Sequence, residues 1–354
     1  MKKKSAAFYS PYWNIYGGGE RYLLQIAEKL DEYQLYFIAP DNLKKKAKEF
    51  FGLNLRGKVI EPAALAGHDT AKRFKLLNRF DLFFYTTDGS LFFPFSRRNY
   101  LIIQSPKHIP ENTFYNRLKL LNWRIICYSQ FMKKIVDRNL KTQSTVLPPV
   151  VDTEIFSYRE EKKENLILSV GRFFLGDMHE KRQDFLIDFF SNNRRSLAGW
   201  RLVLAGNVSE ESSQKYLEKL QAKIIDLPVS IYANLNFNDL LSFYQKAKIY
   251  WHAAGYGQDL IKHPEKAEHF GITTLEAMAS GCVPIVFKAG GQLDIIQEGI
   301  NGWFWEDEET LLQKTVQLAS DESGRQDFAE RSLKRAEFFS VNNYKEKINE
   351  ILKK

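Results

Sequence analysis

Cysteine is scarce in this chain, which has only Cys127 and Cys282 among its 354 residues. Each lies in an apolar run, so we expect two buried, reduced thiols, and two cysteines are too few for the disulfide framework of a small secreted protein. No apolar stretch approaches the roughly 18 residues of a membrane-spanning helix. The N-terminal Met-Lys-Lys-Lys-Ser leads into a short strand-like run rather than the core of a signal peptide. The sequence therefore predicts a cytoplasmic protein.

Several motifs of other protein classes are also missing. The chain has no Asp-x-Asp pair and no repeat of a solenoid period, and its first glycine-rich turn is neither a dinucleotide fingerprint nor a Walker loop. What remains is an ordinary globular composition, with 44% hydrophobic and 27% charged residues. Because one hydrophobic core rarely supports a chain of this length, we expect two domains.

Strand-like apolar runs alternate with helical patterns along the chain, which predicts parallel sheets flanked by helices. The pattern breaks at residues 148–152, and the charged stretch 159–164 follows as a linker. We therefore predict an α/β fold of two doubly wound, Rossmann-like domains that face each other across a cleft, with ligands beyond the carboxyl ends of the strands. The domains would span residues 1–150 and 151–335, and 336–354 would form a C-terminal helix that packs back on the first domain.

The expected elements can be placed on the sequence from these patterns. In the first half, strands are expected at 6–9, 35–38, 82–85, 100–103, 125–128 and 144–147, with a helix at 19–30. In the second half, strands are expected at 166–170, 201–205, 229–232, 249–252 and 283–287, with helices at 183–190, 214–224 and 238–245.

Charge is distributed unevenly along the chain. Residues 1–150 hold 25 Lys and Arg against 12 Asp and Glu, a net of +13, whereas the remainder carries −5. Basic patches bind nucleic acid, acidic lipid headgroups or phosphorylated molecules. In residues 72–77 and 114–124 the basic residues alternate with large apolar ones, as in an amphipathic helix at a membrane interface. The alternative for each is a surface helix whose apolar stripe faces the core.

The most informative segment is EHFGITTLE, in which Glu268 and Glu276 flank a glycine and two threonines. The pattern predicts a turn at Gly271, a short helix from about Thr273, and a buried strand at 283–287. Orphan amides and the positive end of a helix dipole favour a phosphate before such a helix, and carboxylates accept hydrogen bonds from sugar hydroxyls. A nucleotide-sugar would suit this segment. Alternatively, Thr273 and Glu276 form a capping box, and Glu268 is a solvated loop charge.

Three further segments follow expected strands and could contact the same ligand. The glycines at 17–19 let the backbone approach a ligand and cradle phosphate. Arg172 and Lys181 are two cations that could neutralise a diphosphate, or else two solvated loop charges. The turn at 290–292 again offers backbone amides to a ligand.

In this order, the segments GGGER, GRFF…EKRQDFL, EHFGITTLEAMASGCVPIVF and GGQLDII…GINGWFW resemble the retaining glycosyltransferases of family 4, which have the GT-B fold. The resemblance covers nearly the whole chain. It implies metal-independent, cofactor-free transfer of a hexose from a nucleotide-diphosphate sugar to a hydroxyl acceptor, in cell-surface polysaccharide or glycolipid synthesis. The implied partners are the nucleotide-sugar and a glycan or lipid-linked acceptor. The basic first half adds an anionic membrane surface at the inner face of the membrane, and no nucleic acid is expected.

The resemblance also implies roles for individual residues. Glu276 would hold the ribose hydroxyls, and Glu268 would contact the donor hexose or its leaving-group region. Arg172 and Lys181 would bind the diphosphate, with the glycines of the first domain along its phosphate side. The catalytic residues would be Arg172, Lys181, Glu268 and His108, and the donor-binding residues Gly18, Gly19, Gly271, Ile272, Thr273, Thr274 and Glu276.

Two features depart from the family pattern. Lys181 stands nine positions after Arg172 and precedes Arg182, whereas the family often has a shorter spacing followed by Lys-Gly. The acceptor-domain histidine of the family is represented at best by His108, which follows a strand and is flanked by prolines; the alternative is a merely exposed loop histidine. Rival interpretations are a nucleotide-sugar epimerase or a phosphorylase on the same fold, a module that binds nucleic acid or another anionic polymer, and a noncatalytic carbohydrate-binding relative.

Overall fold

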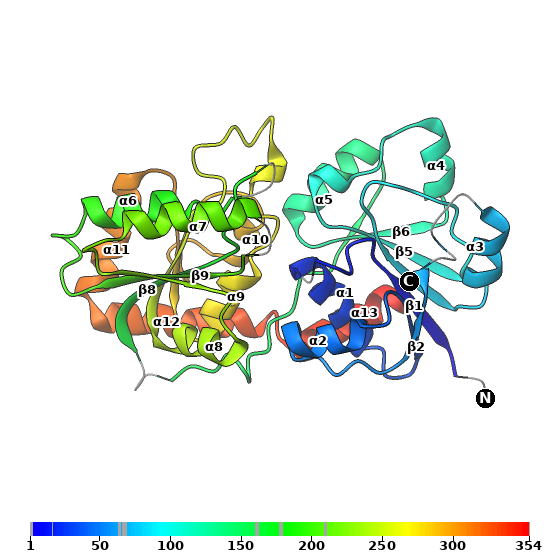
Figure 1. Ribbon diagram of the computed structural model, residues 1–354, viewed down its shortest axis with the longest axis horizontal. Helices are drawn as coiled ribbons and strands as arrows, with labels where there is room; N and C mark the ends of the chain where they lie inside the picture. Colours follow the sequence, from blue (N-terminus) through cyan, green and yellow to red (C-terminus); the bar gives the residue numbers. More distant parts are fainter. Residues whose placement is uncertain are drawn as a thin grey trace. The chain divides into compact units, whose positions relative to one another are not determined.

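The computed structural model shows two compact units. It describes residues 3–15, 17–62, 65, 69–159, 163–176, 180–208 and 211–353. The first unit contains Met1–Val150 and Tyr344–Lys354, and the second contains Val151–Asn343. Residues 160–162 of the expected linker and 177–179, between Arg172 and Lys181, lie outside the described residues. Both units are α/β, with one parallel sheet each (Figure 1).

The first unit is built on a seven-stranded parallel sheet of order β3-β2-β1-β4-β5-β6-β7. Strand β4 is buried along its whole length, because a parallel sheet covered by helices on both faces buries both. The Phe8 ring stacks on Phe84 with centroids 5.0 Å apart, and Phe84 stacks on Tyr100 at 4.7 Å. The strands are β1 (Ser5–Tyr9), β2 (Gln34–Ile38), β3 (Lys58–Ile60), β4 (Leu82–Thr86), β5 (Arg98–Ile103), β6 (Trp123–Cys127) and β7 (Thr145–Val146).

The helices of the first unit include the end of the chain. From Tyr344 onward α13 belongs to this unit, where the Lys345 ammonium lies 3.0 Å from the Asp31 carboxylate and Arg98 donates to the carbonyl of Leu352. The helices are α1 (Gly18–Glu28), α2 (Leu43–Phe51), α3 (Thr70–Leu77), η2 (Pro106–His108), α4 (Phe114–Leu120), α5 (Gln130–Leu140) and α13 (Val341–Lys353).

The second unit is built on a six-stranded parallel sheet of order β10-β9-β8-β11-β12-β13. Helices α6 and α7 cover one face of this sheet, and α8, α9 and α12 cover the other (Figure 1). The strands are β8 (Glu164–Val170), β9 (Arg201–Gly206), β10 (Val229–Ala233), β11 (Ala247–His252), β12 (Val283–Phe287) and β13 (Trp303–Trp305). The helices are α6 (Gln183–Asn192), α7 (Glu211–Lys223), α8 (Phe237–Lys246), η4 (Pro264–Lys266), α9 (Ile272–Ala279), α10 (Gln292–Ile295), α11 (Glu308–Ser320) and α12 (Glu322–Glu337).

Strand order in the second sheet reverses between β8 and β11. The chain runs outward through β9 and β10 and then returns to the other side of β8. In open parallel sheets the crossovers on the two sides of such a reversal diverge, and a crevice opens at the carboxyl ends of the strands. A ligand is therefore expected to bind near the residues that follow β8 and β11.

Large aromatic side chains fill the core of the second unit. Trp251 and Trp305 are completely buried, and the indole of Trp251 donates to the Thr315 hydroxyl at 3.1 Å, so that the polar end of a buried ring is satisfied. Both cysteines are free and buried, which confirms their prediction. None of the described helices combines the length and the apolar character needed to cross a bilayer.

Candidate functional site

Three polar side chains meet at the carboxyl edge of the second sheet. His252, the last residue of β11, lies with its Nε2 3.0 Å from Oε2 of Glu268, and Lys181, just before α6, forms an ion pair with the same oxygen. The side chains of His252, Glu268 and Lys181 are only 3%, 10% and 15% exposed. Glu268 is therefore not the solvated loop charge of the alternative interpretation.

His252 is held neutral in this cluster. Its burial lowers the pKa of the imidazole, and the neighbouring Glu268 carboxylate opposes that shift only in part. Because a carboxylate accepts hydrogen bonds, Nε2 carries the proton and donates to Glu268. The buried Nδ1 has no hydrogen-bond partner among the described residues, and an unprotonated nitrogen tolerates this better than an unpaired N–H would. His252 thus acts as a neutral donor that orients Glu268.

Helix α9 begins at the same edge. Its N-cap is Gly271, with φ of +114°, a conformation that glycine adopts without strain. A Cβ at this position would also lie 2.6 Å from Nε2 of the buried Gln292. The Tyr250 hydroxyl of β11 lies 2.8 Å from Oγ1 of Thr273, which fixes the first turn of the helix to the sheet. Within the described chain, no protein acceptor is bonded to the amides of Ile272 and Thr273, so the turn presents two donors and the positive end of the helix dipole.

Glu276 lies on α9, and the capping-box interpretation of this residue is wrong. The helix starts one residue before Thr273, whose side chain therefore cannot act as the N-cap. Instead, the buried hydroxyl of Tyr244, on α8, donates to Oε2 of Glu276 at 2.9 Å. Glu276 is 4% exposed, so this bond fixes the orientation of a carboxylate that has little freedom to turn.

The turn at residues 290–292 supports the Glu268 segment, and the prediction that its glycines offer amides to a ligand is wrong for Gly291. The Gly291 amide donates to the carbonyl of Glu268 at 2.7 Å. A Cβ on Gly290 would lie 2.1 Å from that same carbonyl oxygen, and one on Gly291 would lie 2.3 Å from Cα of Phe270. The two glycines are needed because the two backbones touch.

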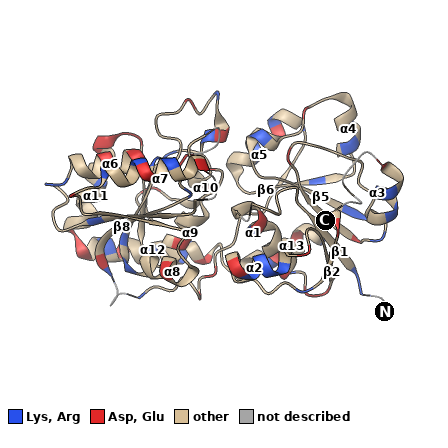
Figure 2. Cartoon of the chain, viewed as in Figure 1, with Lys and Arg blue, Asp and Glu red and all other residues tan. Residues whose placement is uncertain are grey.

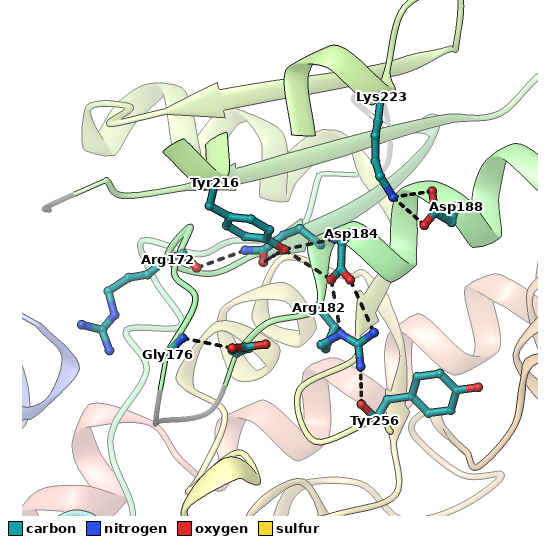
Figure 3. A network of polar contacts seen from close by, with 10 residues as sticks. Arg172, Gly176, Arg182, Asp184, Asp188, Tyr216, Lys223 and Tyr256 are labelled. Atoms are coloured by element: carbon teal, nitrogen blue, oxygen red, sulfur yellow. Dashed lines mark hydrogen bonds and ion pairs between the residues drawn. The ribbon is translucent and has the colours of Figure 1, made fainter. Parts of the chain in front are cut away.

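Arg172 follows β8 and behaves differently from Lys181. Its backbone carbonyl accepts a bond of 3.1 Å from Gln183 Nε2, which also donates to Gly171 at 3.1 Å. The guanidinium is exposed and points away from the polar network drawn in Figure 3, lying 5.7 Å from the ring centre of Phe174. Among the described residues, the polar contact of Arg172 is made by its backbone carbonyl. The guanidinium is therefore available to a ligand.

The neighbouring cation, Arg182, is bonded to other residues of the second unit. It caps α6 in the left-handed region, with φ of +53°, and its guanidinium lies 3.2 Å from Asp184 and 2.5 Å from the carbonyl of Tyr256 (Figure 3). Arg182 follows Lys181 at the position where the resembled family often has glycine. Its contacts fix the start of α6, and with it the adjacent Lys181.

The predicted residues of the first unit lie at the carboxyl edge of its own sheet. Gly18 opens α1, and a Cβ on Gly19 would lie 2.1 Å from Oε1 of Gln104, so a larger residue there would displace the end of that side chain. His108 lies with Nε2 3.2 Å from the Tyr12 hydroxyl, and the two rings stack. Burial lowers the pKa of His108. His108 is therefore a packed, half-buried histidine rather than an exposed loop residue.

Sequence reasoning missed His252, Tyr244 and Tyr250. Tyr250 lies within β11, His252 is the last residue of that strand, and Tyr244 lies on α8. In the sequence, each looks like an ordinary buried residue of its strand or helix. A polar residue at the carboxyl end of a buried parallel strand was the available indication for His252. Tyr244 is 32 positions from Glu276, and only the fold brings them together. Among the residues described, no group of three or more His, Cys, Asp or Glu side chains is arranged to hold a metal ion.

Comparison with known proteins gives a family match. The family model described as "Glycosyl transferases group 1" matches residues 150–335, slightly more than half of the chain. An uncharacterized glycosyltransferase of Methanocaldococcus jannaschii is 26% identical over 219 residues, 61% of this chain and 55% of the relative. The GDP-Man:Man(3)GlcNAc(2)-PP-Dol alpha-1,2-mannosyltransferase of Neurospora crassa is 25% identical over 166 residues, 44% of this chain. The chain spans only about half of the first relative's length and 28% of the second's.

A solved structure matches the whole fold. The crystal structure of Anabaena Alr3699/HepE in complex with UDP has a TM-score of 0.74 to this chain, with 16% sequence identity and 99% of each chain covered. At this identity the likeness shows the fold. Together with the two Rossmann-like sheets, it confirms the predicted α/β, GT-B type of architecture.

Proposed function

The chain belongs to the glycosyl transferases group 1 family, and on this premise we propose that it is a retaining glycosyltransferase that moves a hexose from a nucleotide-diphosphate sugar to a hydroxyl acceptor. The observation that carries the proposal is the convergence of Lys181, Glu268 and the start of α9 at the carboxyl edge of β8 and β11. Cations, helix-terminal amides and buried carboxylates are what a sugar diphosphate needs, because its phosphates are anionic and its sugars are rich in hydroxyl donors.

In the proposed donor complex, the diphosphate lies at the start of α9. The amides of Ile272 and Thr273 would donate to its oxygens, and the exposed guanidinium of Arg172 would bind the phosphates. Thr274, which is buried, would support this turn from within the protein. Glu276, held by Tyr244, would accept from the ribose hydroxyls. The crystal structures of Anabaena Alr3699/HepE with UDP and with UDP-glucose support a donor of this class.

Lys181 and Glu268 would act at the bond that breaks. Cleavage of the sugar–diphosphate bond places negative charge on the leaving phosphate and positive charge on the sugar ring. Lys181 has three N–H donors, so it could remain paired with Glu268 and still approach the phosphate, while the Glu268 carboxylate would lie on the side of the developing cation. Preorganised charges of this kind stabilise the transition state more than the ground state. We propose that they do so without a divalent metal, and that the acceptor attacks from the same face within an ion pair.

Residues of the first unit would serve both the donor and the acceptor. Gly18 and Gly19 are proposed to line the phosphates, and His108 to contact the acceptor hydroxyl. A glycan or lipid-linked acceptor used in cell-surface polysaccharide or glycolipid synthesis fits the basic first half of the chain, and the protein would then work in the cytoplasm at the inner face of the membrane. An epimerase on the same fold, or a noncatalytic carbohydrate-binding protein, is separated from this proposal by transfer activity.

The test begins with a thermal-shift screen of UDP, GDP, ADP and their sugars. A ligand that binds only the native state at 100 times its Kd stabilises it by about 2.7 kcal/mol, so one base should raise Tm selectively. Release of the matching nucleoside diphosphate from its sugar is then measured for the wild type and Glu276→Ala, with Glu218→Ala, on the exposed face of α7, as the matched control. We expect turnover to be lost in Glu276→Ala and retained in the control. EDTA should not reduce the turnover of the wild type. Normal turnover in Glu276→Ala, or a requirement for added Mg²⁺ or Mn²⁺, would refute the assigned chemistry.

A further inference from the structure

Helix α4 leaves its large apolar side chains in water. None of its residues is buried, and Phe114, Leu118 and the C-cap residue Leu121 are 78%, 41% and 78% exposed. Their spacing of four and three residues places them on one face of the helix. Leu120, on the same helix, packs against the core, but the stripe of Phe114, Leu118 and Leu121 does not follow the alternative of an apolar face turned to the core. Exposed apolar stripes of this kind mark surfaces that meet a membrane or another protein.

The stripe is part of a larger surface. The Tyr115 ring packs edge-on against Phe93 with centroids 5.7 Å apart, and the guanidinium of Arg73, on α3, lies 4.6 Å from the ring centre of Phe92. The Lys119 ammonium lies 4.4 Å from the ring centre of Tyr115. These contacts join the two helices, through Phe92 and Phe93 of the segment between β4 and β5, into one surface. We call it the α3–α4 face: residues 72–75, 92, 93, 95 and 114–121.

The charge around the stripe is predominantly positive. Residues 70–124 carry 10 Lys and Arg against 3 Asp and Glu, and both helices show basic positions in Figure 2. On the face itself, Lys75 and Arg117 are exposed, and Lys72 is paired at 3.5 Å with Asp69. Helix α3 differs from α4 in that Leu76 and Leu77 are buried, so it anchors the face to the core.

We propose that the α3–α4 face docks on the surface of an anionic lipid bilayer. Phe114, Leu118 and Leu121 enter the boundary between headgroups and acyl chains, and the surrounding Lys and Arg side chains lie against the lipid phosphates. A bilayer fits both features at once, because it offers an apolar interior beneath a negatively charged surface. A nucleic acid would use the charges and leave the apolar stripe in water. The evidence for this docking does not depend on the proposed transfer reaction.

Sedimentation with vesicles tests the docking on the full chain. Vesicles of phosphatidylcholine alone are compared with vesicles that contain about 30% phosphatidylglycerol, at low and at high salt. The charge variant is Lys75→Ser/Arg117→Ser, and its control is Lys215→Ser/Lys219→Ser on the exposed face of α7. The apolar variant is Phe114→Ser/Leu121→Ser, and its control is Ile225→Ser/Ile261→Ser, two residues that are 71% and 96% exposed in the second unit.

We expect the wild type to bind the anionic vesicles and to be released by salt. Removal of the two charges should weaken binding about thirtyfold, and removal of the two apolar side chains about tenfold or more, whereas both controls should bind like the wild type. Circular-dichroism melts and the thermal shift produced by nucleotide, which depend on fold and on the second unit, should be unchanged in all four variants. Absence of wild-type binding, equal loss in the controls, or loss in the charge variant alone would overturn the proposal, and the last result would indicate a polyanion instead of a bilayer.

Discussion

The bond between His252 and Glu268 supports a prediction whose size follows from the structure. His252→Leu removes a 3.0 Å hydrogen bond to a carboxylate. Hydrogen bonds to charged groups contribute about 1.5–3 kcal/mol, and each 1.4 kcal/mol corresponds to a tenfold change in rate. If Glu268 must be held in place while positive charge develops on the sugar, kcat should fall about 10- to 100-fold. His252→Gln places an amide N–H near the position of Nε2 and should restore most of that loss.

Release of nucleoside diphosphate from the donor identified by screening measures both parameters. KM for the donor should change by less than about threefold, because the substitution leaves the proposed ribose contact of Glu276 and the amides of α9 untouched. The control is His263→Leu, which removes a histidine of the same unit whose side chain is 54% exposed. Equal kcat in the Leu variant and the wild type would refute the positioning role. A Gln variant as slow as the Leu variant would show that ring packing, rather than hydrogen bonding, is what Glu268 needs.

Three further predictions follow from single contacts. Arg172→Ala should leave the free energy of unfolding within about 0.5 kcal/mol of the wild type but weaken donor affinity about tenfold or more in calorimetric titration; unchanged affinity would remove Arg172 from the site. Gly291→Ala should lower the free energy of unfolding by about 1–3 kcal/mol in urea titrations, because its Cβ would lie 2.3 Å from Cα of Phe270; a neutral result would contradict that backbone contact. Because burial lowers the pKa of His252 in the folded state, its contribution is present above the unfolded pKa and is lost as pH falls. The stability of the wild type relative to His252→Gln should therefore decline below about pH 6.5, by at most about 1.4 kcal/mol per pH unit, and a constant difference would show that His252 takes up protons equally in both states.

Much of the fold could be predicted from periodicity, because buried parallel strands are short runs of apolar residues with distinct helical segments between them. The expected strands at 82–85, 100–103 and 166–170 lie within β4, β5 and β8. Strands β3 and β13 were not predicted, since three residues are too few to show a period. Their pairing with β2 and β12 is decided by the sheet and not by their own sequence.

The candidate site was predictable where its residues are close in sequence. Gly271 and the two glutamates follow from one nine-residue segment, since a glycine before a helix has a local conformational cause. The contacts of Glu268 with Lys181 and of Glu276 with Tyr244 span 87 and 32 positions. Propensity carries no information on such pairs, because they depend on which strands are neighbours. For the same reason the exposure of α4 required the structure, since its sequence fits a buried and an exposed stripe equally well.

The proposed function requires that a nucleoside diphosphate binds at the carboxyl edge of β8 and β11. The most direct measurement is a crystal structure of the protein with the nucleoside diphosphate that the screen selects. We expect phosphate oxygens within about 3.2 Å of the amides of Ile272 and Thr273. The ribose hydroxyls should donate to Glu276, and the Arg172 guanidinium should turn toward the phosphates. A nucleotide bound elsewhere, with Glu276 contacting only Tyr244, would contradict the proposed function.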